Sequence, residues 1–292
     1  MAAAHTDTVI PFVFEKLPVR GALVQLKKSW QRMQVGHRYE RPVLEILGHA
    51  AAASTLIAQS LKFDGHITLQ ITGDGPLSML VMQCTSGLQL RGMARAELDG
   101  RELPYAELVQ RAHCAITVDR KGAERPYQGI VEVAGDSLAA SLEQYYARSA
   151  QVPTHLALVG EQTLAGGLLL QQMPAEAPPA ADDWRRLGLL AATLASRDLV
   201  GGAAIDLLAK LFAEDDLRVF ESRAASFHCR CSQRRAEDVL RMLGPDEARA
   251  AAASRGRVDV TCEYCGRTRS FDEVDLKRLF AAPTGPSSGR VH

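Results

Sequence analysis

Hydrophobic and polar residues alternate along much of the first half of the chain, a period that is typical of half-buried β-strands. The clearest case is His66–Thr72, where every second residue is isoleucine or leucine. Turn residues at Gly73–Pro76 and Ser86-Gly87 mark off the following strands, which predicts an antiparallel meander. The predicted strands are Val9–Phe14, Val19–Leu26 continuing toward Trp30, His66–Thr72, Leu77–Cys84, Leu88–Ala96, Ala115–Asp119, Gly129–Val133, Thr154–Val159 and Leu164–Gln171.

A helical period replaces this alternation twice. Apolar residues recur every three or four positions in Glu40–Lys62, and a second helix is predicted to run from a cap at Asp136 or Ser137 to Ser149. Glycine costs about 1 kcal/mol relative to alanine in an exposed helix, so Gly48 is expected to pack closely against a sheet. Strands and helices mix without strict β-α-β alternation, which predicts an α+β core with antiparallel sheets.

The pattern changes after Met173, where prolines cluster up to Pro179. Two Leu- and Ala-rich amphipathic helices are predicted beyond this boundary, Trp184–Ser196 and Ala203–Phe212, joined by Gly201-Gly202. We expect them to form a helical linker over residues 175–225, following a core domain over residues 1–174.

A small C-terminal domain is predicted over residues 226–282, followed by a disordered Gly-, Ser- and Pro-rich tail over residues 283–292. Ser232 is expected to cap a helix that Gly244-Pro245 ends. Arg257–Cys262 alternates like a strand, and Asp272 is expected to cap the last helix.

Four cysteines in this domain have the spacing of metal ligands: Cys229 and Cys231 form a C-x-C pair, and Cys262 and Cys265 form a C-x-x-C pair. Four thiolates are a ligand set of closed, structural tetrahedral zinc sites. A domain with so few large apolar residues usually needs a metal or disulfides to fold, and zinc supplies roughly 10–16 kcal/mol in comparable peptides. We therefore predict one Zn²⁺ and folding that depends on it.

Zinc binding and disulfide formation exclude each other at such a site. Thiolates at about 2.3 Å from zinc lie about 3.7 Å apart in a tetrahedron, whereas a disulfide requires about 2.05 Å. A bond between Cys229 and Cys231 closes a small, strained ring, and strained disulfides are the labile, regulatory kind. The spacing thus favours a switch, while a permanent zinc staple remains the simpler alternative.

Several basic residues crowd the cysteines: Arg230, Arg234, Arg235, Arg267 and Arg269. They can offset the charge of four thiolates and favour their ionisation, or they can be ordinary solvated arginines or a nucleic-acid patch. His228 abuts the first ligand and is interpreted as a bystander. Cys84 and Cys114 lie at the ends of apolar strands and are expected to be buried, inert thiols.

Composition narrows the function classes. Hydrophobic residues make up 47% of the 292 residues and the formal net charge is +0, which supports a substantial core and gives no support to a nucleic-acid or membrane partner. The first residues lack the basic and apolar regions of a signal peptide, and the longest apolar run, Leu187–Ala195, is too short to span a bilayer. We expect a cytoplasmic protein that is not an enzyme, because no catalytic constellation is visible.

Motifs in order along nearly the whole chain resemble the thirty-three-kilodalton chaperonin family of bacterial heat-shock proteins. The matching stretches include Leu61-Lys-Phe-Asp-Gly, Gln70-Ile-Thr-Gly-Asp-Gly-Pro-Leu, Asp216-Leu-Arg-Val-Phe-Glu, Phe227-His-Cys-Arg-Cys and Val260-Thr-Cys-Glu-Tyr-Cys. Two departures stand out: Ala248–Ser254 is Ala-rich where a more acidic helix is expected, and Arg269–Phe271 replaces an aromatic-x-Phe pattern. Both leave the four cysteines intact.

The resemblance implies a redox-regulated, ATP-independent holdase. In the reduced state the four cysteines would hold zinc and the protein would be inactive and, we expect, monomeric. Hypochlorite, or peroxide with heat, would form the disulfides Cys229–Cys231 and Cys262–Cys265, release zinc, unfold the C-terminal domain and linker, and yield a homodimer that binds unfolding client proteins. The candidate client-binding surface is the apolar face of the linker: Trp184, Leu187, Leu194, Ile205, Leu208 and Phe212.

Two rival functions follow from the same cysteines. A zinc ribbon can grip nucleic acid, although the neutral net charge speaks against it. A thiol–disulfide oxidoreductase can use Cys262-Glu263-Tyr264-Cys265, although such a motif normally opens a helix in a β-α-β context that the pattern lacks.

Overall fold

The computed structural model describes residues 7–133, 136–200, 204–253 and 255–281. The predicted Gly201-Gly202 junction and the tail 283–292 lie outside these residues. The chain divides into two compact units, Met1–His228 and Cys229–His292. The finer boundaries at residues 174 and 225 stay predictions.

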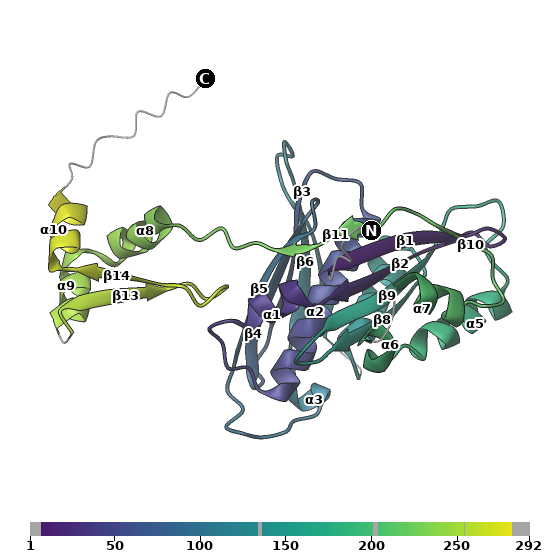
Figure 1. The fold of residues 1–292 in the computed structure, drawn as a ribbon, viewed down its shortest axis with the longest axis horizontal. Coiled ribbons are helices and arrows are strands. Elements are labelled where there is room, and N and C mark those ends of the chain that lie inside the picture. Colours follow the sequence, from purple (N-terminus) through teal and green to yellow (C-terminus); the bar gives the residue numbers. More distant parts are fainter. Residues whose placement is uncertain (1–6, 134–135, 201–203, 254, 282–292) are drawn as a thin grey trace. The chain divides into compact units, whose positions relative to one another are not determined.

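The first unit contains two six-stranded sheets, coloured purple to green in Figure 1. The first sheet has the order β10-β1-β2-β9-β8, and β11 also pairs with β1; all its pairs are antiparallel. Its strands are β1 (Thr8–Phe14), β2 (Val19–Leu26), β8 (Thr154–Gly160), β9 (Ala165–Gln172), β10 (Leu217–Val219) and β11 (Arg223–Ala224).

The second sheet has the order β12-β5-β4-β3-β6-β7. The predicted meander is present as β3, β4 and β5, and only the short β12 runs parallel to its neighbour, β5. Its strands are β3 (Gly65–Thr72), β4 (Leu77–Thr85), β5 (Gln89–Ala96), β6 (His113–Arg120), β7 (Tyr127–Glu132) and β12 (Ser226–Phe227).

Helix α2 (Arg41–Ser60) contacts strands of both sheets and forms the centre of the main core (Figure 1). Its middle is thin, as predicted, and lies very close to β8. A Cβ atom at Gly48 would lie 2.7 Å from the Cα atom of Gly160, so any larger residue would push the helix off the sheet. The packing reason expected for this glycine is confirmed.

The first sheet is buried on both faces. Its strand β2 sends Ala22 and Val24 toward α2, while Val19 and Leu23 face the opposite side. That opposite side is covered by the apolar faces of the linker helices α5 (Ala181–Ala192), α6 (Ser196–Val200) and α7 (Ala204–Leu211). These helices therefore act as a lid on the sheet.

One sequence expectation is wrong here, the strand continuing toward Trp30, and another, a cap at Asp136 or Ser137, is confirmed at Ser137. The chain from Leu26 toward Trp30 is not strand but helix α1 (Lys28–Gln34), whose first turn is held by Asp7. Of the two proposed caps for α4 (Leu138–Tyr145), Ser137 is the one that accepts a hydrogen bond, 3.2 Å from the Ala140 nitrogen. The remaining elements of this unit are α3 (Tyr105–Leu108) and a π-helical turn, η1 (Tyr146–Ala150).

The second unit is small. Its elements are α8 (Gln233–Leu243), α9 (Pro245–Ala253), the hairpin β13 (Arg257–Thr261) and β14 (Thr268–Asp272), and α10 (Glu273–Ala281). Ser232 caps α8, accepting from the Arg235 nitrogen, and Asp272 caps α10, accepting from the Asp275 nitrogen at 2.8 Å; both caps were predicted. The buried core consists of Ala236, Leu240, Ala248, Ala252, Phe271 and Leu276.

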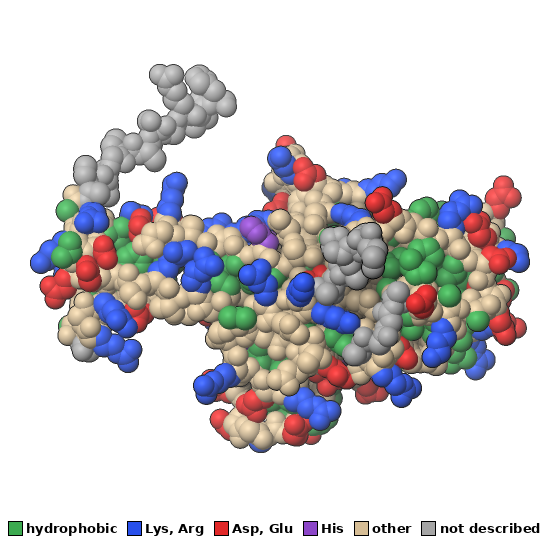
Figure 2. All heavy atoms as spheres, viewed as in Figure 1, with side chains coloured by type: hydrophobic (Ala, Val, Ile, Leu, Met, Phe, Trp, Pro, Cys, Tyr) green, Lys and Arg blue, Asp and Glu red, His purple; other side chains and the backbone are tan. Residues whose placement is uncertain are grey.

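The architecture confirms the predicted α+β class, with antiparallel sheets dominating. Among the described residues, no helix is both long enough and apolar enough to cross a bilayer. Lys and Arg are interspersed with Asp and Glu over the face that Figure 2 shows, in keeping with the balanced formal charge.

Candidate metal centre

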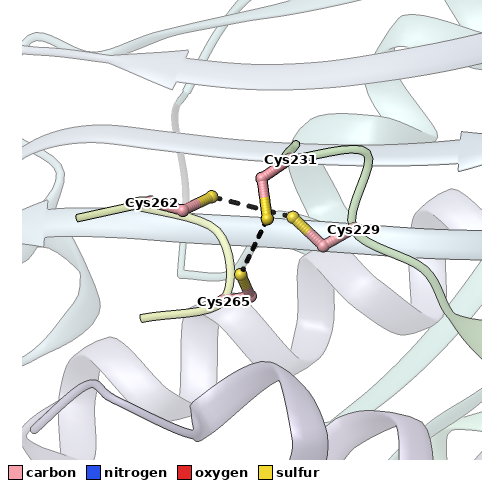
Figure 3. A group of neighbouring side chains, drawn as sticks. All are labelled: Cys229, Cys231, Cys262 and Cys265. Carbon is pink, nitrogen blue, oxygen red and sulfur yellow. Dashed lines mark hydrogen bonds between the residues drawn. The ribbon is translucent and has the colours of Figure 1, made fainter. Parts of the chain in front are cut away.

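The four cysteines come from two loops of the second unit that meet at one point (Figure 3). Cys229 and Cys231 lie in the loop that leads into α8, and Ser232 fixes the end of this loop by capping the helix. Cys262 and Cys265 lie in the turn of the hairpin β13–β14. Local capping and a tight hairpin thus position all four side chains.

The hairpin turn is closed by backbone hydrogen bonds around the C-x-x-C pair. The Gly266 nitrogen donates to the Cys262 oxygen at 2.8 Å, and the Cys262 nitrogen donates to the Arg267 oxygen at 3.0 Å. Gly266 has a φ of 64°, in the left-handed region that favours glycine, and this lets the chain reverse directly after Cys265. Both thiols therefore project to the same side of the turn.

The four Sγ atoms all lie within 4.8 Å of one another. The Cys229 and Cys262 sulfurs are 3.7 Å apart, and the Cys231 and Cys265 sulfurs are 3.5 Å apart. These distances are far longer than a disulfide, and all four thiols are unpaired. They are close to the roughly 3.7 Å expected between ligands of a tetrahedral zinc–thiolate centre, so the residues fit a zinc ion.

Electrostatics also favours a cation at this point. Burial raises the pKa of Cys229 to about 12 and raises that of Cys265. At Cys231 burial acts in the same sense, but hydrogen bonds from Cys265 and the other two thiols, together with the Arg267 guanidinium, lower the pKa overall. Four thiolates so close together repel one another, and a bound divalent cation is what allows all of them to ionise.

The basic residues around the site are mostly at the surface. Arg230, Arg234, Arg235 and Arg267 are exposed, and Arg269 is half-buried and donates to the Gln233 side chain at 3.3 Å. Of these, Arg267 lowers the pKa of a ligand thiol, which agrees with the interpretation that basic residues support thiolates. His228 is exposed and is not part of the four-residue cluster.

The two remaining cysteines are buried, as predicted, and their inertness stays a prediction. Cys84 and Cys114 are 0% exposed in the main core. Burial raises the pKa of each thiol to about 12. Neither thiol forms a disulfide.

Five of the six predicted linker residues face the first sheet, partly or fully buried. Leu187, Leu194, Leu208 and Phe212 are 9% exposed or less, and Trp184 is half-buried. Trp184 stacks on His155 of β8, with ring centroids 4.3 Å apart. Ile205 differs, because 54% of its surface is exposed. In Figure 2, hydrophobic surface gathers where β1, β2 and α7 lie in Figure 1.

One more segment, residues 216–228, lies directly before Cys229, and its role was not predicted from the sequence. It contains β10, β11 and β12, and it pairs with the outer strand of each sheet. Arg223 anchors it by donating to the Gln59 side chain and the Ser86 oxygen, each at 2.7 Å. No regular alternation marks these short strands, so their pairing could not be seen in the sequence.

Sequence comparison places these features among known proteins. A family model described as Hsp33 protein matches residues 7–272. A 33 kDa chaperonin of Methylobacillus flagellatus is 39% identical over 280 residues, which cover 94% of each chain. A 33 kDa chaperonin of Cronobacter sakazakii is 37% identical over 290 residues, which cover 97% of this chain and 99% of the relative.

Structural comparison agrees at the level of the fold. The crystal structure of a 33 kDa chaperonin from Thermotoga maritima matches with a TM-score of 0.79. The match covers 94% of this chain and 98% of that chain at 22% sequence identity. The likeness extends through both units and shows that the arrangement of elements is shared.

Proposed function

The chain belongs to the Hsp33 family, and on that premise we propose that it is a redox-regulated, ATP-independent chaperone that holds unfolding proteins. Its reduced, zinc-bound form is inactive and monomeric in this proposal. Oxidation converts it to a homodimeric form that prevents aggregation during oxidative stress in the cytoplasm. The proposal is carried by one observation: four sulfur atoms within 4.8 Å of one another close a unit with very little core of its own.

Cys229, Cys231, Cys262 and Cys265 would hold the metal as thiolates. When bound, Zn²⁺ would supply the positive charge that keeps four thiolates together and so closes the small unit. The six fully buried residues of this unit include three alanines, which bury little apolar surface. The fold of the second unit would therefore depend on the four cysteines staying reduced and able to bind the metal.

Oxidation would remove all four ligands at once. In each motif, two thiolates would lose one electron pair to hypochlorous acid, the protonated form of hypochlorite, which leaves as chloride and hydroxide while a sulfur–sulfur bond forms. We propose the pairs Cys229–Cys231 and Cys262–Cys265, as in the resemblance described above. The contacts at 3.7 and 3.5 Å run the other way, from loop to hairpin, so the proposed disulfides would replace contacts between the two segments with bonds inside each one.

The choice of pairing decides the outcome. A disulfide across the segments would close a loop of 33 or 34 residues and would stabilise the unit by about 3–4 kcal/mol. A disulfide within each motif closes only a tiny ring and joins nothing across the unit. Only the second pairing leaves the small unit without closure, which is what activation requires.

Unfolding of the second unit would then loosen the linker that precedes it. The linker helices cover an apolar sheet face formed by residues such as Phe12, Leu23 and Leu168. If they leave, their own apolar face and the sheet face both become available to a client. Neither surface requires nucleotide binding or chemistry, in keeping with relatives that are named chaperonins.

The test pairs two measurements on one sample. The reduced, zinc-loaded protein is treated with hypochlorite, and zinc release is followed together with suppression of aggregation of a thermally unfolding client enzyme. Both should appear together and reverse with a reductant. Zinc release without suppression of aggregation would refute the chaperone proposal.

A control variant isolates the four cysteines. Cys84→Ala combined with Cys114→Ala leaves only the proposed ligands, and it should respond to hypochlorite like the parent protein. Peptide mapping of this oxidised variant should find Cys229 linked to Cys231 and Cys262 linked to Cys265. Disulfides between Cys229 and Cys262 would contradict the proposed pairing.

A further inference from the structure

We propose that the outer edges of β1 and β5 are acceptor sites for extended segments of unfolded polypeptide. In this structure both edges are occupied by residues 216–228 of the chain itself. A client strand would take their place after the segment leaves. This inference rests on the proposed chaperone function and names the surface and the binding mode that serve it.

The outer edge of β1 already pairs with extended chain in this structure, along β10 and β11. Its register with β10 is antiparallel, with Phe12 opposite Val219 and Phe14 opposite Leu217. Backbone bonds extend the pairing at both ends: the Glu15 nitrogen donates to the Asp216 oxygen, and the Phe220 nitrogen donates to the Pro11 oxygen, each at 2.9 Å. A second short pairing follows, with Thr8 opposite Ala224.

The edge of β5 receives the same segment in parallel orientation. Ser226 lies opposite Gln89, and Phe227 lies opposite Leu90. The Ser226 nitrogen donates to the Leu88 oxygen at 3.0 Å, and the His228 nitrogen donates to the Leu90 oxygen at 2.8 Å. One stretch of chain therefore pairs along one edge of each sheet.

The segment is held mainly through its backbone. Most of its side chains are exposed, including Phe220 at 47%, and only Ala225 is buried. The ion pairs Lys16–Asp216 and Arg218–Glu15 lie at the surface, where such pairs contribute roughly 0–1 kcal/mol each. Little apolar burial opposes its departure.

Recognition through backbone groups suits a partner without a fixed sequence. A strand edge offers N–H and C=O groups that any extended polypeptide can pair with, apart from its prolines. A folded protein has few such unpaired strands, whereas an unfolding protein has many. The edges of β1 and β5 therefore distinguish unfolded from folded partners by the state of the backbone rather than by side chains.

The covering segment is also tied to the proposed switch by the chain itself. The last bond to β5 is made by His228, and Cys229 follows directly. Forming a disulfide between Cys229 and Cys231 bends the backbone two residues from that bond. The same event that removes the metal ligands thus disturbs the end of the segment that covers β5.

Hydrogen exchange tests this in three states: reduced, oxidised, and oxidised with a short synthetic peptide of alternating Val and Lys. On oxidation, the Glu15 amide and the amides of residues 220–228 should lose protection. On adding the peptide, Glu15 should regain protection while residues 220–228 stay unprotected. Peptide-induced protection confined to α5 and α7 would overturn the proposal.

A second measurement uses the same peptide with N-methyl groups on alternate residues, which remove the donors along one side. It should bind the oxidised protein about tenfold more weakly or worse, since lost hydrogen bonds of this kind cost at least that much. Equal affinity would overturn the proposal, because binding would then not use strand pairing. Protection of Glu15 that rises with protein concentration, without peptide, would also overturn it by assigning the edge to a second copy of the chain.

These outcomes are separable from failure of the proposed function. If the oxidised protein does not suppress aggregation at all, the chaperone proposal fails. If it suppresses aggregation while the Glu15 amide remains unaffected by the peptide, only the strand-edge inference fails.

Discussion

The two units of the chain are held together in different ways. The first unit has a continuous core of large side chains around α2, including Trp30, Leu47 and Leu56, none of which is exposed. Among its described residues, the second unit buries six hydrophobic side chains, with four more packed partly buried against them, and it brings four sulfur atoms within 4.8 Å of one another. We therefore expect a reaction at those sulfurs to unfold the second unit while the first unit stays folded.

The linker helices α5, α6 and α7 are intermediate in how they are stabilised. They bury apolar side chains as a core does, yet the sheet they cover has a second, independent partner in α2. Their removal would uncover the sheet without dissolving it. The chain thus has three parts that differ in how they are stabilised: the core of the first unit, the linker helices and the second unit. Each part can be tested by a change that affects it alone.

The largest effect is expected from removing the metal ligands. Cys262→Ser, or a zinc chelator, should unfold the second unit, because it removes most of the roughly 10 kcal/mol or more that structural zinc supplies. Hydrogen exchange should show full loss of protection in α8 and α10 and unchanged protection in α2. Retained protection in α8 would mean that its small core suffices.

Once chelation has unfolded the second unit, its thiols should react on the order of a thousandfold faster than those of the first unit. The pKa of Cys84 and of Cys114 is raised from 9.0 to about 12, so at pH 8 they stay protonated as well as buried. Iodoacetamide should label the four cluster cysteines after chelation but neither of these two. Rapid labelling of Cys84 in the native protein would show that the first unit opens easily.

The same shifts predict a loss of stability in alkali. The folded state holds these two protons more tightly than the unfolded chain does, so their contribution is complete below about pH 9 and declines as the pH rises toward 12. Thermal melts of the first unit between pH 8 and pH 10 measure this decline. A midpoint that rises with pH would contradict the assignment.

A cavity created beneath the linker helices should lower the free energy of unfolding by about 2–5 kcal/mol. Leu208→Ala removes a side chain that is 1% exposed, so α7 should detach more often and the zinc-loaded protein should suppress aggregation without oxidant. Ile205→Ala on the same helix is the matched control, because a half-exposed side chain should change stability by less than about 0.5 kcal/mol. Equal effects of the two variants would argue against lid opening.

A smaller loss of stability, about 1–3 kcal/mol, is expected from a substitution where α5 packs on β8. A Cβ atom at Gly188 would lie 2.6 Å from the His155 ring, so Gly188→Ala should push α5 away while favouring the helix itself by about 1 kcal/mol. Higher helicity with partial activity in the reduced state is the expected signature. Leu189→Ala, at an exposed position, serves as the control.

The smallest loss of stability, about 1 kcal/mol, is expected in residues 216–228, the segment before the cysteines. Arg223→Ala removes two exposed hydrogen bonds, so residues 220–228 should exchange faster while zinc stays bound. Glu221→Ala, at a neighbouring exposed position, should leave exchange unchanged. If Arg223→Ala released zinc, the segment and the metal centre would be coupled more tightly than their contacts indicate.

Features set by neighbouring residues could be predicted from the sequence. The meander of β3, β4 and β5 follows from alternation and turns, and the caps at Ser137, Ser232 and Asp272 each act on a nitrogen three residues ahead. The spacing of the cysteines likewise predicted that four thiols meet at one point, as they do, because each half of such a cluster is local; their role as metal ligands stays a prediction. In these cases the physical cause lies within a short stretch of chain.

Features set by distant partners were missed. Helix α1 is held at its start by Asp7, 22 residues before Ser29, and no local pattern announces that cap. The strands β10, β11 and β12 exist because two sheet edges are available, not because their sequence alternates. The contacts between sulfur atoms, Cys229 with Cys262 and Cys231 with Cys265, also depend on how the loop and the hairpin pack together.

The covering of β1 has a consequence for synthesis of the protein. Glu15 and its partner Arg218 are separated by 203 positions, so the edge is complete long before the ribosome has made the segment that covers it. After β9 ends at Gln172, 44 further positions separate it from Asp216, so at roughly 5–20 residues per second the edges of β1 and β5 stay bare for about 2–9 seconds. The first unfolded polypeptide to meet these edges is thus the unfinished remainder of the same molecule.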